Sequence, residues 1–223
     1  MSAAGDVQVI EVDEDKAADY FTTPSWCVRR LLEEWGPTRA GAWVEPTAGN
    51  GAIIRAVNAV WRGDPITWRA MELREVEREA LAAIPGLEFR ICNFLTVDDE
   101  PDEDVAVVID NPPFSKAFEC LMQAHRLYPN AEIVFLLRLA FKASKGRHAF
   151  MRHHMPDEYS LPDRASFDGI GGDNSDYAWL RWPADWVRRI GHGRILNSTP
   201  LEERQRDRGH RIVAVNPQRE MFG

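Results

Sequence analysis

Residues 104–128 read DVAVVIDNPPFSKAFECLMQAHRLY, and this stretch decides which fold the sequence predicts. Its first seven residues are a nearly continuous apolar run, which is typical of a strand buried on both faces of a sheet. Apolar side chains then recur at helical spacing over residues 115–128, which predicts a helix. A buried strand that leads into a helix is the repeating unit of a parallel sheet.

The same alternation runs through the first two thirds of the chain. A helix is predicted near the N-terminus, with Thr23 as its N-cap, Pro24 at its first position and Gly36 at its end. Further strands are predicted over 42–46, 66–73, 87–94 and 131–139, and further helices over 51–61 and 74–84. This pattern predicts an α/β fold with a doubly wound, mostly parallel sheet that is covered on both faces.

The C-terminal third departs from the alternation. Residues 160–167 and 176–182 are two strand-like runs joined by the glycine-rich DGIGGDNS, which predicts an antiparallel hairpin at one edge of the sheet. The odd spacing of Trp179 and Trp182 predicts that one ring is buried and the other exposed. Three further elements are expected: a short helix over 183–191, a charged helix or loop over 201–209, and a last strand over 211–216.

Composition excludes several classes of protein. No apolar run approaches the roughly 18 residues that span a bilayer, and the acidic N-terminus lacks the features of a signal peptide. Cys27, Cys92 and Cys120 are isolated, which fits neither a disulfide framework nor a cysteine zinc site. We therefore expect a cytoplasmic protein with no membrane partner.

The net charge of −8 is unevenly spread. Residues 1–129 carry 12 Lys and Arg against 23 Asp and Glu, whereas residues 130–223 carry 15 against 12. A locally basic part can face phosphates although the whole protein is acidic. The candidates for nucleic-acid contact are Lys142, Lys145, Arg147, Arg152 and Arg164, with an ordinary solvated helix as the alternative for 141–154. No cluster has the ligand spacing of a metal site, so no metal is expected.

Polar or conformationally special residues follow each predicted parallel strand. Ligands of open parallel sheets bind beyond the carboxyl ends of the strands, so these residues mark a candidate site. They are EPTAGNG (45–51), Glu72, Asn93-Phe94 and DNPPF (110–114). Each also has a plainer interpretation: a tight turn, a surface glutamate, a turn asparagine beside a core phenylalanine, and a double-proline turn.

The EPTAGNG loop has neither the dinucleotide-binding nor the P-loop pattern. Gly49 and Gly51 would let the backbone turn sharply and approach a ligand. The acidic Glu45 favours a ligand with an ammonium group over a pyrophosphate. Glu72 is placed to accept hydrogen bonds from ribose hydroxyls, and Asn93 to bond an adenine edge whose face Phe94 covers.

DNPPF forms a rigid corner, because each proline fixes its own φ and Pro112 also restricts Asn111. A planar amine could donate one hydrogen to the Asn111 side chain and the other to the Pro112 carbonyl. Phe114 could stack on the ring that carries this amine. Positioning alone would then supply much of the rate of a reaction at the nitrogen.

The order of these motifs resembles that of S-adenosylmethionine-dependent amino-methyltransferases, specifically the gamma-class N6-adenine DNA methyltransferases. The resemblance is carried by FTTP (21–24), EPTAGNG, Glu72, Asn93-Phe94 and DNPPF. LPDRASF (161–167) and DYAWLRW (176–182) resemble the phage and prophage members. It implies a class I methyltransferase Rossmann-like fold, with a flexible acidic N-terminus (1–18), a single methyltransferase domain (19–223) and a short basic extension (184–223) in place of a large target-recognition domain.

The resemblance also implies the roles of individual residues. The residues implied to bind S-adenosylmethionine are Tyr20, Phe21, Thr22, Pro24, Glu45, Pro46, Thr47, Ala48, Gly49, Gly51, Glu72, Asn93, Phe94 and Asp110. The residues implied to form the catalytic corner are Asp110, Asn111, Pro112, Pro113 and Phe114. The family often has Asp where this chain has Asn93, and an amide oxygen there is expected to weaken cofactor binding rather than abolish it.

The expected reaction is methyl transfer from S-adenosylmethionine to the N6 amine of adenine in DNA, with short or relaxed sequence specificity. A duplex substrate would require the base to be flipped into the site. The expected protein is a monomer or homodimer. Two alternatives stay open: an RNA adenine or guanine amino-methyltransferase, and a non-catalytic accessory subunit.

Overall fold

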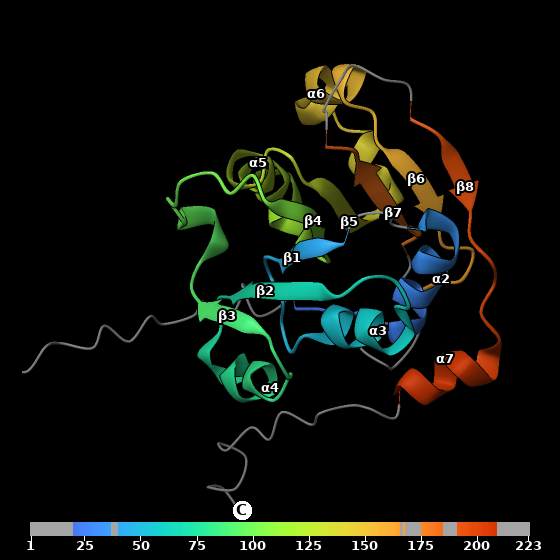
Figure 1. Cartoon of the computed structure of the whole chain (residues 1–223). Helices are drawn as coiled ribbons and strands as arrows, with labels where there is room; N and C mark the ends of the chain where they lie inside the picture. Colours follow the sequence, from blue (N-terminus) through green and yellow to red (C-terminus); the bar gives the residue numbers. More distant parts are fainter. Residues whose placement is uncertain (1–19, 37–39, 166, 168–174, 185–190, 209–223) are drawn as a thin grey trace, which may run out of the picture.

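A computed structural model of the chain describes residues 20–36, 40–165, 167, 175–184 and 191–208. Within these residues one eight-stranded sheet has the strand order β3-β2-β1-β4-β5-β7-β6-β8 (Figure 1). Its strands are β1 Gly41–Glu45, β2 Ile66–Glu72, β3 Glu88–Ile91, β4 Val105–Asp110, β5 Glu132–Arg138, β6 Asp157–Ser160, β7 Tyr177–Trp182 and β8 Gly193–Ile195. The α-helices are α2 Ser25–Trp35, α3 Ala52–Val60, α4 Arg78–Ala82, α5 Ala117–Leu127, α6 His148–His153 and α7 Leu201–Arg208. Short 3-10 helices are η1 Glu75–Glu77, η2 Phe94–Thr96, η3 Phe114–Lys116, η4 Leu139–Lys142 and η5 Lys145–Arg147.

The sheet confirms the predicted architecture. Strands β3, β2, β1, β4 and β5 are parallel, and β7 pairs antiparallel with both β5 and β6. The chain winds outward from β1 to β3 and then returns to place β4 on the other side of β1. The strand order therefore reverses between β1 and β4, which is where such sheets form a ligand crevice.

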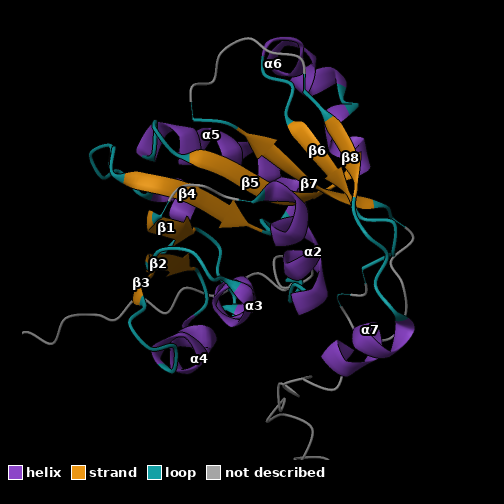
Figure 2. Ribbon diagram, turned by 45° about the vertical axis from the view of Figure 1, so that its right-hand side comes forward, coloured by secondary structure: helices purple, strands orange, loops and turns teal. Residues whose placement is uncertain are grey.

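Two apolar cores lie on opposite faces of the sheet. All six residues of β4 are buried, because alternate side chains enter different cores: Val107 and Ile109 join the core under α2 and α3, and Val108 joins the core under α5. The helices lie accordingly, with α2 and α3 on one side and α5 on the other (Figure 1, Figure 2). The continuous apolar run of β4 is thus explained, because each face of the strand packs in its own core.

The C-terminal hairpin differs from its prediction. The strand predicted over 160–167 is wrong, because β6 ends at Ser160 and Pro162 has no N–H for a sheet ladder. Trp179 and Trp182 are both buried, at 0% and 2% exposure. One exposed ring was predicted for an edge position, but β7 lies inside the sheet and has a core on each face. Strand β8 was not predicted, and its three residues pair parallel with β6.

Several helix boundaries also differ from the predicted ones. Helix α2 begins at Ser25 after Pro24, so Thr23 does not cap it. The helix predicted over 74–84 divides into η1 and α4. The predicted helix near 201–209 is confirmed as α7. Residues 1–18, most of 183–191, and 211–216 lie outside the described residues.

No described helix has the length and apolar character needed to cross a membrane.

Candidate active site

The glycine loop after β1 turns the chain sharply into α3. Gly49 and Gly51 have φ values of 54° and 78°, a region that side chains rarely adopt. A Cβ atom on Gly51 would lie 2.5 Å from Cδ1 of Ile84, so this position also lacks space for a side chain. The loop is tied to the next strand, because the Gly49 N–H donates to Glu72 Oε2 at 2.7 Å. The close approach of this loop to a ligand stays a prediction.

Three buried carboxylates meet beside this loop. Glu45, Glu72 and Asp110 end β1, β2 and β4 and are 2%, 4% and 0% exposed. Glu72 accepts from Gly49 and from Arg74, whose Nε lies 2.8 Å from Oε1. Asp110 accepts from the Thr47 hydroxyl at 2.9 Å. Glu45 is the least satisfied, because its Oε2 has no hydrogen-bond partner among the described residues.

Burial changes the protonation of this cluster. It raises the pKa of Asp110 to about 7, although hydrogen bonds from Thr47 and Asn111 act in the opposite direction. Burial also raises the pKa of Glu45 well above its usual range, and the neighbouring charge of Asp110 adds to the rise. Buried carboxylates favour the neutral form when no cation is near. The cluster is therefore suited to a positively charged ligand, which would favour the ionised form.

Asn111 begins the rigid corner after β4, and its side-chain orientation is fixed by two hydrogen bonds. Its Nδ2 donates to the Phe21 carbonyl at 3.1 Å and to the Thr23 hydroxyl at 3.0 Å. A carbonyl can only accept, so the amide nitrogen has to face Phe21. The amide oxygen Oδ1 is buried and has no partner among the described residues. The corner thus presents one oriented acceptor.

Aromatic rings surround Phe114. Its ring stacks on Phe21 with centroids 5.4 Å apart and an interplanar angle of 27°. Tyr177 lies 5.5 Å away on β7, and Phe167 meets the ring edge-on at 6.2 Å. The guanidinium of Arg138, at the end of β5, lies 4.7 Å from the ring centroid. These rings, which we call the aromatic cluster, lie with the Asn111 amide at the carboxyl edge of the sheet.

Residues 20–24, which we call the N-terminal strap, join the two halves of the site. The Tyr20 ring lies over the glycine loop, 3.0 Å from where a Gly49 Cβ would be. Arg74 holds that ring with its Cζ 3.4 Å from the ring centroid, while pairing with Glu72. At its other end the strap accepts from Asn111, so it contacts both the carboxylates' loop and the rigid corner.

The two residues after β3 have separate environments. Asn93 is exposed and its Oδ1 accepts from the Leu95 N–H at 3.1 Å, which caps η2. Phe94 is 3% exposed and packs in the core under α5. Both follow β3 at the carboxyl edge of the sheet, and the adenine contacts expected of them stay predictions.

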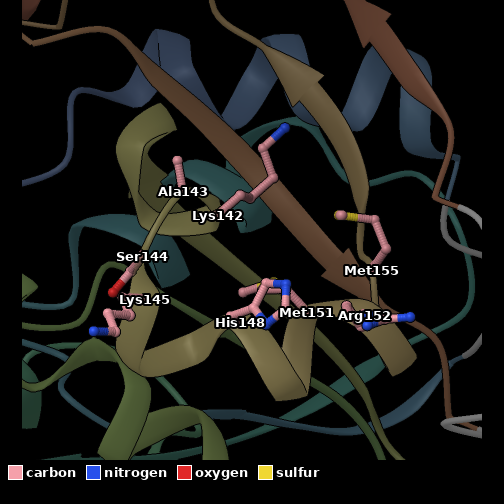
Figure 3. Close-up of a pocket in the computed structure, with 8 residues that line it drawn as sticks. All are labelled: Lys142, Ala143, Ser144, Lys145, His148, Met151, Arg152 and Met155. Atoms are coloured by element: carbon pink, nitrogen blue, oxygen red, sulfur yellow. The ribbon is translucent and has the colours of Figure 1, made fainter.

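The predicted nucleic-acid residues occupy several environments. Lys142 pairs with Glu158, Arg147 donates to the Phe141 carbonyl at 2.8 Å, and Arg164 lies 3.4 Å from Asp176. Lys145 and Arg152 are exposed. A hollow of about 640 Å³ is lined by Lys142, Ala143, Ser144, Lys145, His148, Met151, Arg152 and Met155 (Figure 3).

This hollow is formed by the segment between β5 and β6. Strand β6 runs in the direction of β5, since both are antiparallel to β7. The segment that carries α6 therefore leads from the carboxyl end of β5 back to the amino end of β6. Its phosphate-binding role stays a prediction. Among the described residues, no group of three or more His, Cys, Asp or Glu could hold a metal ion.

Sequence reasoning did not select five residues of the site. Each of them contacts the glycine loop, Asn111, Phe114 or a direct partner of one of these. They are Thr23, Arg74, Arg138, Phe167 and Tyr177. Thr23 and Phe167 lie within the quoted motifs FTTP and LPDRASF, so a signal existed for them. Arg138 and Tyr177 reach the site only because β5 and β7 pair, with these two residues in register.

No protein-family model and no curated protein matches the chain. Solved structures do. A predicted O-methyltransferase from Agrobacterium tumefaciens, protein Atu636, matches with a TM-score of 0.56 and 15% identity over 83% of this chain and 96% of its own. The methyltransferase subunit of a type I restriction-modification system from Streptococcus thermophilus matches at 0.59 and 14%, over 83% of this chain and 52% of its own. The 23S rRNA methyltransferase ErmE matches at 0.55 and 18%, over 78% and 71%.

At such low sequence identities, the structural similarity establishes the fold alone. The reaction has to be inferred from the residues of the site. The described sheet is mostly parallel with one antiparallel strand, β7, and its fold is similar to these structures over most of the chain. The chain has the Rossmann-like fold of class I methyltransferases.

Proposed function

We propose that the protein transfers a methyl group from S-adenosylmethionine to the exocyclic N6 amine of adenine in DNA. The observation that carries this proposal is the orientation of Asn111. Two bonds to the N-terminal strap hold its amide nitrogen and leave Oδ1, buried and unpartnered among the described residues, to accept from a ligand. An exocyclic amine is a donor that fits this acceptor.

The residues at the glycine loop fit the proposed cofactor. S-adenosylmethionine carries an ammonium, a sulfonium and ribose hydroxyls, and its sulfonium methyl is the group transferred. The unpartnered Glu45 carboxylate oxygen and the glycine loop would hold the methionine end, beside the strap. Glu72 Oε1 accepts two hydrogen bonds from Arg74, and Oε2 accepts one from Gly49, so Oε2 keeps capacity for a ribose hydroxyl.

The rigid corner would hold the target amine. One N–H would donate to Asn111 Oδ1 and the other to the Pro112 carbonyl, which favours a nitrogen whose lone pair points at the methyl group. Stacking on Phe114 contributes about 1–3 kcal/mol per base in nucleic-acid complexes. The nitrogen gains a bond to the methyl carbon as the carbon–sulfur bond breaks, and it then releases a proton to water. Orientation supplies the main rate advantage, so no base of tuned pKa is required.

DNA is favoured as the substrate by the gamma-class order of the motifs. A base in a duplex would have to leave the stack to reach Asn111, and the aromatic cluster is suited to receive it. An RNA amino-methyltransferase is the second candidate, since the same corner can hold any base amine. An accessory subunit is disfavoured, because it would have no use for an oriented acceptor at Asn111.

The test is incubation of the protein with methyl-labelled S-adenosylmethionine and, separately, unmethylated genomic DNA, total RNA and a protein extract. Digestion and mass spectrometry then identify the modified unit. We expect N6-methyladenine in DNA, and mapping the modified positions would give the sequence context. Label in RNA alone would exclude the DNA assignment, and cofactor binding without any transfer would support the accessory subunit.

A further inference from the structure

The Thr23 hydroxyl has a partner that its sequence position does not predict. A threonine before Pro24 was expected to cap α2, but the helix has no side-chain cap and begins at Ser25. Thr23 is instead 5% exposed, and its Oγ1 accepts from Asn111 Nδ2 at 3.0 Å. Its hydroxyl therefore serves the rigid corner of the site, 88 residues further along the chain.

The bonds to Thr23 and Phe21 together hold the Asn111 amide with its oxygen free to face the target. With both N–H groups directed at the strap, Oδ1 becomes the acceptor. If the amide were rotated by half a turn, Oδ1 would face the Phe21 carbonyl and two acceptors would repel each other. The Phe21 carbonyl therefore selects the orientation, because the Thr23 hydroxyl could also donate to Oδ1. Loss of the Thr23 oxygen would leave one buried N–H unpaired and the amide less firmly held.

We propose that Thr23 is a positioning residue for methyl transfer, one that pairs the second N–H of the Asn111 amide and so holds in place the acceptor offered to the target amine. The inference rests on the proposed function. Thr23 itself does not touch the reacting atoms; it acts through Asn111. The Phe21 carbonyl selects the orientation of the amide, but a main-chain group cannot be replaced by a side-chain substitution.

Three substitutions separate positioning from general stability. Thr23→Val keeps the shape of the side chain and removes the acceptor, whereas Thr23→Ser keeps the acceptor. Thr199→Val is the matched control, because Thr199 is 1% exposed and its hydroxyl accepts from Arg30 Nε at 3.0 Å in the contact with α2. Thr23→Ala, which lacks the acceptor and relieves any crowding, repeats the test if the valine variant does not fold.

The first readout is turnover. We expect Thr23→Val to lower kcat by about 10- to 100-fold, the effect of leaving one buried polar group unpaired. The dissociation constant of S-adenosylmethionine, measured by calorimetry, should change less than threefold, and Thr23→Ser should restore most of kcat. Thr199→Val should lose thermal stability while keeping kcat. Equal kcat values for Thr23→Val and Thr199→Val would overturn the proposal.

The second readout does not depend on activity. In a ¹⁵N-labelled protein the side-chain NH₂ signals of Asn111 are assigned by their loss in Asn111→Ala. We expect Thr23→Val to shift one of these protons upfield and to speed its exchange with solvent, and Thr199→Val to leave both unchanged. Unmoved signals in Thr23→Val would refute the positioning role. Shifted signals in a protein whose wild type transfers no methyl group would refute the proposed function and leave the pairing of Thr23 with Asn111 standing.

Discussion

The glycine-loop half and the rigid-corner half of the site differ in the kind of interaction that they offer. On the glycine-loop side, three buried carboxylates at the ends of β1, β2 and β4 create an environment that favours a cation and depends on protonation. On the side of the rigid corner, the groups are an amide, a carbonyl and the aromatic cluster, none of which titrates in ordinary buffers. One half therefore selects by charge and the other by hydrogen-bond geometry. The difference teaches that binding of the donor and reaction at the acceptor can be disrupted independently.

The largest separation is expected from Asn111→Ala. Loss of one oriented hydrogen-bonding group in an active site typically lowers kcat by about 10²–10³-fold. Affinity for S-adenosylmethionine, measured by calorimetry, should stay within about threefold, because the carboxylates are untouched. Asn58→Ala is the control, and this variant should keep kcat. Asn58 accepts a hydrogen bond from Trp68 on the face of the sheet that α3 covers. A parallel loss of cofactor affinity in Asn111→Ala would mean that the two halves are not independent.

Glu45→Gln should act on the other half. A hydrogen bond to a charged group contributes about 1.5–3 kcal/mol, so cofactor affinity should fall by roughly 10- to 100-fold. The ligand-free protein should at the same time be no less stable, because a buried carboxylate with an unpartnered oxygen has been neutralised. Calorimetry and denaturant unfolding measure the two effects. Glu33→Gln, on the exposed side of α2, is the control. A large loss of stability without loss of affinity would assign Glu45 a structural role.

A separate effect is expected in the pH dependence of stability. The pKa of Asp110 is about 7 in the folded protein and about 4 in an unfolded chain. Between these values the folded state binds more protons, so this group makes the free energy of unfolding decrease as pH rises from about 4 to 7. Urea unfolding of the ligand-free protein at several pH values should show the decrease. Asp110→Asn should flatten it, whereas Asp98→Asn, at a fully exposed side chain, should not. An unchanged slope in Asp110→Asn would show that the pKa of Asp110 is not raised.

Binding of a cationic ligand should reverse this effect of pH on stability, which gives a second way to compare the two halves of the site. A positive ligand favours ionised Glu45 and Asp110, so its binding should release protons near neutral pH. Calorimetry in buffers of different ionisation enthalpy would count them. Asn111→Ala should release the same number as the wild type, because the rigid corner does not titrate.

The fold was largely predictable because local pattern and tertiary environment agree in the parallel half. The continuous apolar run of β4 was interpretable since both of its faces are buried. The hairpin was harder, because the exposure of Trp182 depends on what covers its face of β7, and Phe141 and His154 from the segment between β5 and β6 contact it there. Strand β8 is only three residues long. A strand so short has no periodicity to recognise.

The site was predictable to the extent that motifs mark strand ends. Glu45, Glu72 and Asp110 converge as expected, because parallel strands bring their carboxyl ends to one edge. The pairing of Asn111 with Thr23 was not predictable, since it depends on how the N-terminal strap crosses that edge. Local pattern favoured a helix cap for the same threonine, and a tertiary hydrogen bond overrides it.

The two ends of the sheet have a consequence for association. In the part of the chain that the structure describes, the sheet ends on β3, with four residues, and on β8, with three. Unpaired strand edges are templates on which other chains can add strands, and short edges limit such addition. The described sheet therefore offers little backbone for edge-to-edge growth, which protects against aggregation. Edges this short in the described sheet favour a homodimer that forms through side-chain contacts over one that forms by strand pairing.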